Sequence, residues 1–430
     1  MALREVAVAA AVVLAGACAA ACADPDGPPP CVPAAPTATG FYAVHESCGA
    51  WTLVDPDGAP FVSRGVNSIT AHGTRNAVTG AYAYHDAILA KYGSEEAWGR
   101  ATGARLRGWG FNTAGGWSQA ELLADDLAVT AVLYLSGSDW QSGTIVDWFD
   151  PAWEAHVRAR VDEVVTPWRG DRRVLGWFLD NEMKWGPDWR GADTLLGQYL
   201  TMPATAPGKA VAVDTVLEVE PTAGPRDELL ARTAWASVPA AAATRFLERA
   251  AERYFATTTA ILRAADPDHL ILGNRDVSVM TRAEVWQAAA RHVDVLSVNY
   301  YVYKEGVDML ALNLSGGVDP AGWFAAQHAL TGKAFLISEF GFRAADSGLP
   351  NSWPPVYPTL ATQADRADAY DTYVSGARTA PWIVGTHWFE MTDQPADGRF
   401  DGEDNNWGLV DEADDAYPVL VDRMTAVNAR

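Results

Sequence analysis

The sequence predicts an α/β protein, a (β/α)8 TIM barrel with an N-terminal hairpin and an insertion after strand 4. Two observations point to this fold class. Short apolar runs alternate with amphipathic stretches of helical length, which is typical of parallel βα units. Polar and aromatic residues gather where the apolar runs end, as the functional rim of a barrel requires. No glycine-rich phosphate loop follows the first run, which disfavours a doubly wound nucleotide-binding sheet.

The alternation supplies eight strand candidates and seven helix candidates. The strands are expected at residues 61–67, 110–115, 128–135, 174–180, 269–274, 293–301, 334–339 and 383–388. The helices are expected at 94–107, 151–165, 240–264, 282–291, 320–330, 363–378 and 416–428. The turn Asp55-Pro56-Asp57-Gly58 predicts a hairpin within 40–60 that plugs one mouth of the barrel. The Pro-, Gly- and Ala-rich segment 184–239 is expected to form a lid or cleft wall with some helix of its own.

The first residues have the composition of an export signal. Arg4 precedes an apolar stretch and a run of small residues, too short together to cross a bilayer. We expect a signal peptide at 1–22, a Pro-rich leader at 23–39 and a single catalytic domain at 40–430, in a secreted or cell-surface protein. Cleavage before Cys22, as in a lipoprotein, is the alternative. Cys31 and Cys48 would remain in the mature chain and could form a disulfide in an oxidising compartment.

Composition and charge restrict the class of partner. The chain has 430 residues, of which 49% are hydrophobic, enough to build a large core. Its formal net charge of −22 repels nucleic acid and other polyanions, so a neutral ligand is favoured and no nucleic-acid partner is expected. We expect a monomer with no transmembrane segment in the mature chain, because no later hydrophobic run approaches the roughly 20 residues that a span needs.

Two strand ends carry the residues that split a glycosidic bond. Asn181 and Glu182 follow the fourth expected strand, and Glu339 ends the seventh. In a closed barrel these two glutamates would face each other across the mouth, as the acid and the nucleophile of a retaining glycosidase do. Glu182 and Glu339 are therefore the candidates for the acid/base and the nucleophile, and the Asn181 amide is expected to bond to the sugar 2-hydroxyl. Asp180, one pleat deeper, is expected to be a buried acceptor.

Other strand ends supply candidate substrate contacts. Tyr301 is expected to donate its hydroxyl to Glu339 and keep it ionised. Trp388 is expected to form the floor beneath the cleaved sugar, because sugar rings stack on indole faces. The remaining candidates for contact with substrate are Asn67, Trp117, Asn299 and His387.

Neither a metal nor a cofactor is expected. No two of the eight histidines lie closer than thirteen positions, so the short-spaced histidine motifs of metallohydrolases are missing. No Gly-x-Ser-x-Gly elbow is present, which disfavours a serine hydrolase. The acidic loop 393–406 has the oxygen density of a calcium site without EF-hand spacing. A solvated turn bordering the active site is the preferred interpretation, and calcium the alternative.

Several motifs together resemble a known family. They are Pro60-Phe61-Val62-Ser63-Arg64-Gly65-Val66-Asn67-Ser68, Trp109-Gly110-Phe111-Asn112-Thr113, Phe178-Leu179-Asp180-Asn181-Glu182-Met183, Ile337-Ser338-Glu339-Phe340, and His387-Trp388-Phe389 with Asp393-Gln394-Pro395. Over about residues 50–425 the chain resembles the retaining (β/α)8 glycosidases of glycoside hydrolase clan A, and within the clan agarase-like and family 5-like proteins.

This resemblance implies a role for each matched position. Asn181-Glu182 matches the acid/base pair, Glu339 the nucleophile, Tyr301 the sixth-strand tyrosine and Trp388 the eighth-strand tryptophan. The expected function is an exported retaining β-glycosidase of a neutral poly- or oligosaccharide, with agarose or another β-galactoside as first substrate. A mannanase- or cellulase-type β-glycanase of the same clan and a non-catalytic carbohydrate-binding barrel are the alternatives, although an inactive barrel would normally lose one glutamate.

Overall fold

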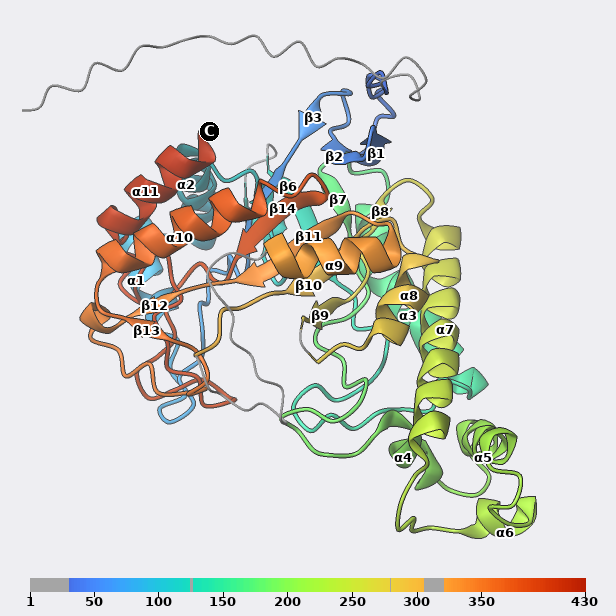
Figure 1. The fold of residues 1–430 in the computed structure, drawn as a ribbon. Coiled ribbons are helices and arrows are strands. Elements are labelled where there is room, and N and C mark those ends of the chain that lie inside the picture. The colour runs from blue at the N-terminus through green and yellow to red at the C-terminus, as the bar shows by residue number, and fades with distance from the viewer. Residues whose placement is uncertain (1–30, 124–126, 279, 305–320) are drawn as a thin grey trace, which may run out of the picture. The chain divides into compact units, whose positions relative to one another are not determined.

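Nine parallel strands form the central sheet of the computed structural model, which describes residues 31–123, 127–278, 280–304 and 321–430 (Figure 1). The expected signal peptide and residues 23–30 of the expected leader lie outside the described residues. The strands are β4 (Ser63–Val66), β5 (Thr113–Ala114), β6 (Ala128–Val132), β7 (Val174–Phe178), β8 (Leu270–Ile271), β9 (Arg275–Val277), β10 (Leu296–Asn299), β11 (Phe335–Phe340) and β14 (Ile383–Trp388). Their order in the sheet is β8-β7-β6-β5-β4-β14-β11-β10-β9, with every pair parallel.

The two ends of this sheet are consecutive in the chain. β8 lies within the fifth expected strand, 269–274, and β9 begins directly after that range; the break between them at residues 272–274 includes Gly273, which has φ +70°. Leu272 N donates to Trp177 O at 2.9 Å, and Arg275 N donates to Asp180 O at 2.9 Å, so both segments lie along β7 and its extension. The sheet therefore curls into a TIM-like arrangement, and the α/β class predicted from the sequence is confirmed.

The helices lie in the predicted order between the strands. The seven expected helices are α2 (Glu95–Gly108), α3 (Pro151–Val165), α7 (Ala240–Ala265), α8 (Ala283–Ala290), α9 (Ala321–Thr331), α10 (Gln363–Ala377) and α11 (Pro418–Asn428). Local signals explain their starts: Ser94 caps α2 by accepting from Ala97 N, and Thr362 and Asp365 form a capping box on α10. α10 and α11 pack side by side, and α3 and α8 pack on α7 (Figure 1).

Other elements have no range predicted from the sequence, although some helix was expected in segment 184–239. α1 (Ala83–Tyr92) buries only Tyr84 and Ile88, too few to give a clear apolar stripe. Segment 184–239 contains α4 (Leu195–Leu200), α5 (Pro207–Val219) and α6 (Arg226–Ala231), and both α4 and α5 pack against α7. Shorter elements are η1 (Ala120–Leu122), η2 (Thr166–Trp168), η3 (Ala345–Ser347), and β12 (Arg343–Ala344) paired with β13 (Thr359–Leu360).

None of the described helices has the length and apolarity of a membrane span.

A small antiparallel sheet precedes β4. It contains β1 (Ala43–Ser47), β2 (Ala50–Val54) and β3 (Pro60–Phe61). Trp51 N donates to Pro381 O at 2.7 Å, just before β14 begins, and Leu53 is fully buried among residues that point into the curled sheet. The hairpin therefore covers the amino-terminal end of the strands.

Cys31 and Cys48 are both disulfide-bonded.

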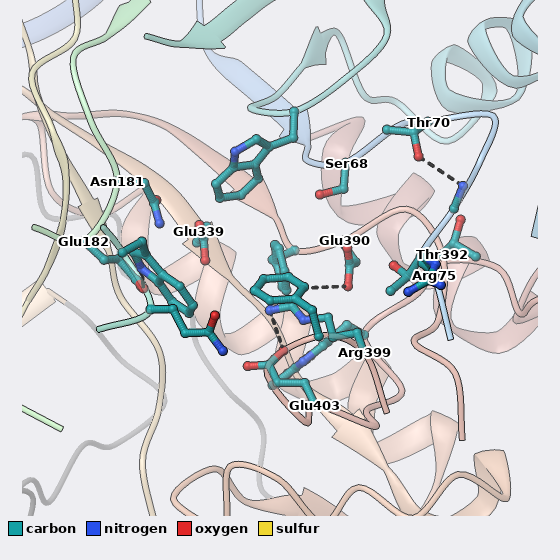
Figure 2. A pocket seen from close by; sticks show the side chains of 18 of the residues that line it. Ser68, Thr70, Arg75, Asn181, Glu182, Glu339, Glu390, Thr392, Arg399 and Glu403 are labelled. Carbon is teal, nitrogen blue, oxygen red and sulfur yellow. Dashed lines mark hydrogen bonds and ion pairs between the residues drawn. The ribbon is translucent and has the colours of Figure 1, made fainter. Parts of the chain in front are cut away.

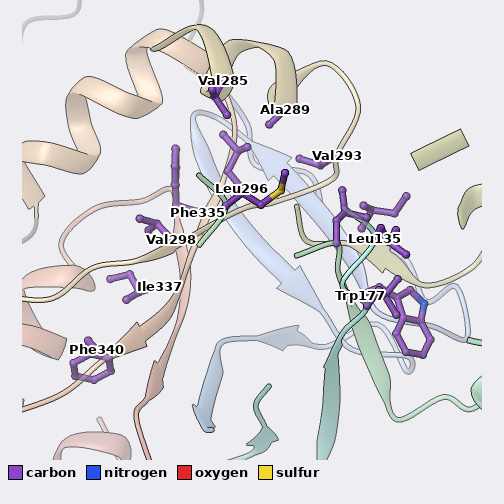
Figure 3. Close-up of a cluster of buried hydrophobic side chains, with 14 of the residues drawn as sticks. Leu135, Trp177, Val285, Ala289, Val293, Leu296, Val298, Phe335, Ile337 and Phe340 are labelled. Atoms are coloured by element: carbon purple, nitrogen blue, oxygen red, sulfur yellow. The ribbon is translucent and has the colours of Figure 1, made fainter. Parts of the chain in front are cut away.

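The sheet separates two layers of apolar side chains. Phe335 and Ile337 of β11 face outward, where they join Val285 and other helix residues in the larger cluster (Figure 3). Leu336 faces inward, with Leu175 and Val384 among others. This alternation is the expected period of a strand buried on both faces.

Candidate active site

A cavity of about 680 Å³ opens at the carboxyl ends of the strands. Glu182, from the loop after β7, and Glu339, from β11, both line it, as do Asn181 and Tyr301. Figure 2 shows Asn181, Glu182 and Glu339 on one side of this cavity, with Glu390, Arg399 and Glu403 beyond them. The volume is within the usual range for ligand sites, roughly 300–1,000 Å³. The structure thus brings together the two carboxyl groups that the strand ends predicted.

Glu339 reaches the cavity because β11 is irregular at this point. Strict alternation would place Glu339 outward like Ile337, and Phe340 inward. Instead Phe340 packs outward against Tyr373, since the register of β11 with β14 shifts between Ile337 and Phe340. Such a shift re-aims the side chain beside it, and here it turns the carboxyl group into the mouth.

The Glu339 carboxyl group is held from both sides. Tyr301 donates its hydroxyl to Oε2 at 2.7 Å, and Arg275 Nη2 lies 3.1 Å from Oε1. Burial raises the pKa of Glu339 to about 7, although Arg275 opposes the shift; the charge of Glu182 adds to it. These contacts fix the orientation of the carboxyl group. They also oppose the effect of burial, which by itself would raise the pKa of this group further.

Arg275 is the site residue that sequence reasoning missed. It is fully buried on β9, and its Nη2 also donates to Asn67 Oδ1 at 3.0 Å and Ser338 O at 2.8 Å. Its guanidinium lies 4.1 Å from the ring centroid of Trp117, a cation–π distance. The sequence feature that could have identified Arg275 is a cationic residue at the end of a buried strand, directly after Asn274.

Glu182 is fixed through its backbone and its side chain. Its N–H donates to Arg275 O at 2.9 Å, and Arg190 Nη2 donates to its carbonyl oxygen at 2.9 Å. Asn299 Nδ2 donates to Oε1 at 3.1 Å, and Trp140 Nε1 donates to Oε2 at 3.2 Å. Each carboxyl oxygen therefore has its own N–H donor, which leaves little freedom to rotate.

The backbone is unusual at four successive strand ends. Ser68, Trp117, Tyr134 and Glu182 follow β4, β5, β6 and β7, and all have positive φ, between 47° and 64°. All four line the cavity. A left-handed conformation costs a non-glycine residue roughly 1–2 kcal/mol. Strain of this kind concentrates at functional sites, so its repetition around one rim marks the cavity independently of the carboxyl groups.

The structure corrects the place of Trp388. It is fully buried outside the cavity, packed against the rings of Phe340 and Tyr370, and its Nε1 donates to Trp407 O at 2.9 Å. Trp407 lines the cavity instead. The parity of β14 places Trp388 on the helix side, and the tryptophan that reaches the cavity, Trp407, comes from the loop after β14.

Three further candidates are not among the described residues that line the cavity. Asn67 is fully buried, and its Nδ2 donates to Ser338 O and Trp388 O at 3.0 and 3.1 Å. Asn299 positions Glu182 and also accepts from Ser338 Oγ at 2.9 Å. His387 Nε2 lies 2.8 Å from Ser63 Oγ, and burial lowers the pKa of His387 to about 3. These side chains bond to the residues of the rim and are buried beneath the cavity lining.

Other candidates lie where the strand ends placed them. Asn181 and Trp117 line the cavity with Tyr301. Asp180 is a buried acceptor of hydrogen bonds from Ser136 and from Tyr254, whose hydroxyl lies 2.6 Å away. Burial raises the pKa of Asp180 to about 6. Segment 184–239 supplies none of the described lining residues, so the expected lid is not part of the cavity wall.

The acidic loop 393–406 borders the cavity but is not a solvated turn. Its Arg399 contacts Glu403 and Asp401, each at 2.9 Å, and lies 4.0 Å from Glu390. Burial raises the pKa of Glu390 to about 7. The carboxylates are thus arranged around a guanidinium, which takes the place that calcium would need.

Comparisons with known proteins find agarases similar to this chain. No family model matches the chain. It is 28% identical over 493 aligned residues to Beta-agarase A of Vibrio sp. (strain JT0107), covering 94% of this chain and 47% of that protein. The expected resemblance to agarase-like glycoside hydrolases is confirmed. The chain spans about half the length of this relative and of Beta-agarase B from the same strain, to which it is 27% identical.

Solved agarase structures share the fold. The crystal structure of the agarase AgWH50C superposes with a TM-score of 0.76 at 24% identity, covering 92% of this chain and 66% of that one. An exo-beta-agarase gives a TM-score of 0.76 at 22% identity, covering 91% of this chain and 65% of that one. The agarase-like fold thus extends over nearly the whole described chain.

Proposed function

We propose that the chain is a retaining β-glycosidase that hydrolyses a neutral, agarose-type poly- or oligosaccharide by double displacement on a closed (β/α)8 barrel. One observation carries the proposal: Glu182, from the loop after β7, and Glu339, from β11, line a single cavity and are held by different donors. Two suitably placed carboxyl groups are sufficient for this chemistry, and no cofactor is implied. The similarity to curated beta-agarases supports the substrate class.

Glu339 is the proposed nucleophile. Its ionised carboxylate attacks the anomeric carbon and forms a glycosyl ester, while the leaving oxygen departs from the opposite side of the ring. Arg275 and Tyr301 each occupy one lone pair of the carboxylate, which leaves further lone pairs for attack. Both contacts favour the ionised form against burial.

Glu182 is the proposed acid/base. It gives a proton to the leaving glycosidic oxygen and later takes one from the water that hydrolyses the ester. Asn299 and Trp140 hold its two oxygens in place through both steps. Asn181, whose Oδ1 accepts from Asn299 Nδ2 at 3.2 Å, is the proposed partner of the sugar 2-hydroxyl.

Aromatic residues give the cavity its preference for sugar. Trp117, Trp140 and Trp407 line it from three different loops, and Phe400 lies edge to face with Trp140 at 6.4 Å. Their rings offer stacking surfaces for the apolar faces of successive sugar units.

We also infer export through the signal peptide at residues 1–22. The protein would be released into the medium or held at the cell surface by a lipid on Cys22.

A hydrolysis screen with two variants tests the proposal. Wild type should release reducing ends from agarose more efficiently than from galactan, mannan or cellulose, and NMR of the first product should show retained anomeric configuration. Glu339→Ala and Glu182→Ala should each lose activity by several orders of magnitude. Azide should rescue Glu339→Ala and yield a glycosyl azide of inverted configuration, whereas any glycosyl azide formed by Glu182→Ala should have retained configuration, because azide there opens the glycosyl ester. Unchanged turnover in either variant would refute that residue's role. A preference for mannan or cellulose would refute the agarose-type substrate and favour a mannanase- or cellulase-type β-glycanase instead.

A further inference from the structure

Three metal-ligating side chains converge beside one wall of the cavity. His72 lies in the loop after β4, His85 in α1, and Glu95 is the first residue of α2. His85 Nε2 lies 2.9 Å from Glu95 Oε1, and His72 Nε2 lies 3.9 Å from the same oxygen. Donor atoms of all three lie within 4.8 Å of one another, the only such group of three or more found among the described histidines, cysteines and acids.

These separations match the size of a zinc coordination shell. Zn²⁺ binds imidazole nitrogen and carboxylate oxygen at about 2.0–2.2 Å, which places tetrahedral ligand atoms about 3.4 Å apart. The observed 2.9 and 3.9 Å lie on either side of that value. Two imidazoles with one carboxylate favour zinc over calcium or magnesium, which prefer all-oxygen shells.

We propose that His72, His85 and Glu95 bind one Zn²⁺, with a fourth position open to solvent. The two imidazole rings are stacked with centroids 4.7 Å apart and an interplanar angle of 10°, so one ring must tilt for both Nε2 atoms to reach one ion. The His72 side chain is 50% exposed and can tilt without displacing core residues.

The site would tie down part of the cavity wall. The loop that carries His72 also supplies Thr70, Arg75 and Tyr82 to the cavity lining. The His72 ring meets the Tyr82 ring edge to face at 5.7 Å. An ion shared by this loop, α1 and α2 would hold that wall in place without contacting Glu182 or Glu339, so its role is separate from the proposed glycosidase chemistry.

The competing explanation needs no metal. His85 and Glu95 form an ordinary hydrogen bond, and His72 covers it by stacking. The two explanations differ in one respect: only a metal site gives saturable binding that depends on all three side chains. Cys31 and Cys48 are disulfide-bonded and do not compete as thiolate ligands.

Calorimetric titration of ZnCl₂ into the tag-free, chelator-treated protein tests the proposal. We expect one ion per chain at pH 7.5, with affinity at least tenfold weaker in His72→Ala, His85→Ala and Glu95→Gln. His156→Ala is the matched control, since His156 is exposed on α3, away from the cluster.

A second measurement protects the result against misfolded variants. Glu95→Gln keeps a side-chain acceptor for His85, so its Tm without metal should match wild type. Zinc should then raise the Tm of wild type and of His156→Ala but not that of Glu95→Gln. Absence of saturable binding up to millimolar zinc, or equal affinity in wild type and all three cluster variants, overturns the site.

Discussion

Replacing Tyr301 with phenylalanine removes one hydroxyl and nothing else from the environment of Glu339. The hydroxyl donates to Glu339 Oε2 at 2.7 Å in a buried setting, where the pKa of Glu339 is already about 7. A hydrogen bond to a charged group contributes about 1.5–3 kcal/mol. One pKa unit corresponds to about 1.4 kcal/mol, so Tyr301→Phe should raise the pKa of Glu339 by about one to two units.

This shift predicts a loss of activity that depends on pH. At pH 6 the ionised fraction of Glu339 falls from about 0.09 to between about 0.01 and 0.001. The kcat/KM of the variant should therefore be about 10- to 100-fold below wild type at pH 6, and within about twofold at pH 9.5. Any alkaline limb common to both enzymes cancels in the ratio.

The assay is a pH profile of kcat/KM on an agaro-oligosaccharide for wild type and Tyr301→Phe. Tyr370→Phe is the matched control, because it also loses a buried hydrogen bond, from Tyr370 to Asn428 Oδ1 at 2.8 Å, away from the two glutamates. That control should keep the wild-type acid limb. A deficit in Tyr301→Phe of equal size at every pH would mean that the hydroxyl acts only on structure, and would refute the reasoning.

Two further predictions concern buried charge. Burial raises the pKa of Glu390 from its usual 4.5 to about 7, so the fold's preference for the protonated form is fully present below pH 4.5 and is lost as the pH rises through 7. The unfolding free energy of the wild type should therefore fall between pH 5 and pH 8 as this contribution is lost. In urea titrations Glu390→Gln should make that fall smaller by about 2–3 kcal/mol, and an equal fall in both proteins would show that Glu390 is not protonated in the folded protein. Arg275→Met removes the cation beside Glu339, and should lower the unfolding free energy by about 3–5 kcal/mol and move the acid limb of kcat/KM upward; an unshifted limb would contradict the ion pair's effect on Glu339.

The two glutamates could be located from the sequence because their prediction depends on two simple features. These are the short apolar runs that mark strands and the rule that the carboxyl ends of parallel strands lie at the same edge of the sheet. Glu182 and Glu339 each close such a run, and both line the cavity. The direction of side chains within a strand was harder, since one irregularity reverses it. Trp388 faces the helices, and Glu339 reaches the mouth only through the register shift in β11.

Other errors arose where polar side chains serve the protein itself. Asn67 and Asn299 stand at strand ends like true ligand contacts, but their amides bond to neighbouring strands and to Glu182. No local pattern separates these two uses. The pair His72 and His85 was passed over because spacing rules describe ligands on one element, whereas here a loop and a helix bring together histidines thirteen positions apart.

Arg275 explains why the interruption of the fifth strand matters. After the turn at Gly273 the chain resumes as β9, with Arg275 N bonded to Asp180 O and Arg275 O accepting from Glu182 N. The side chain of the same residue holds Glu339. One residue thus fixes the backbone that carries the proposed acid/base and the carboxyl group of the proposed nucleophile. The separation of the two glutamates therefore depends on the register of β9 beside the extension of β7, and a one-residue slip there would disconnect both at once.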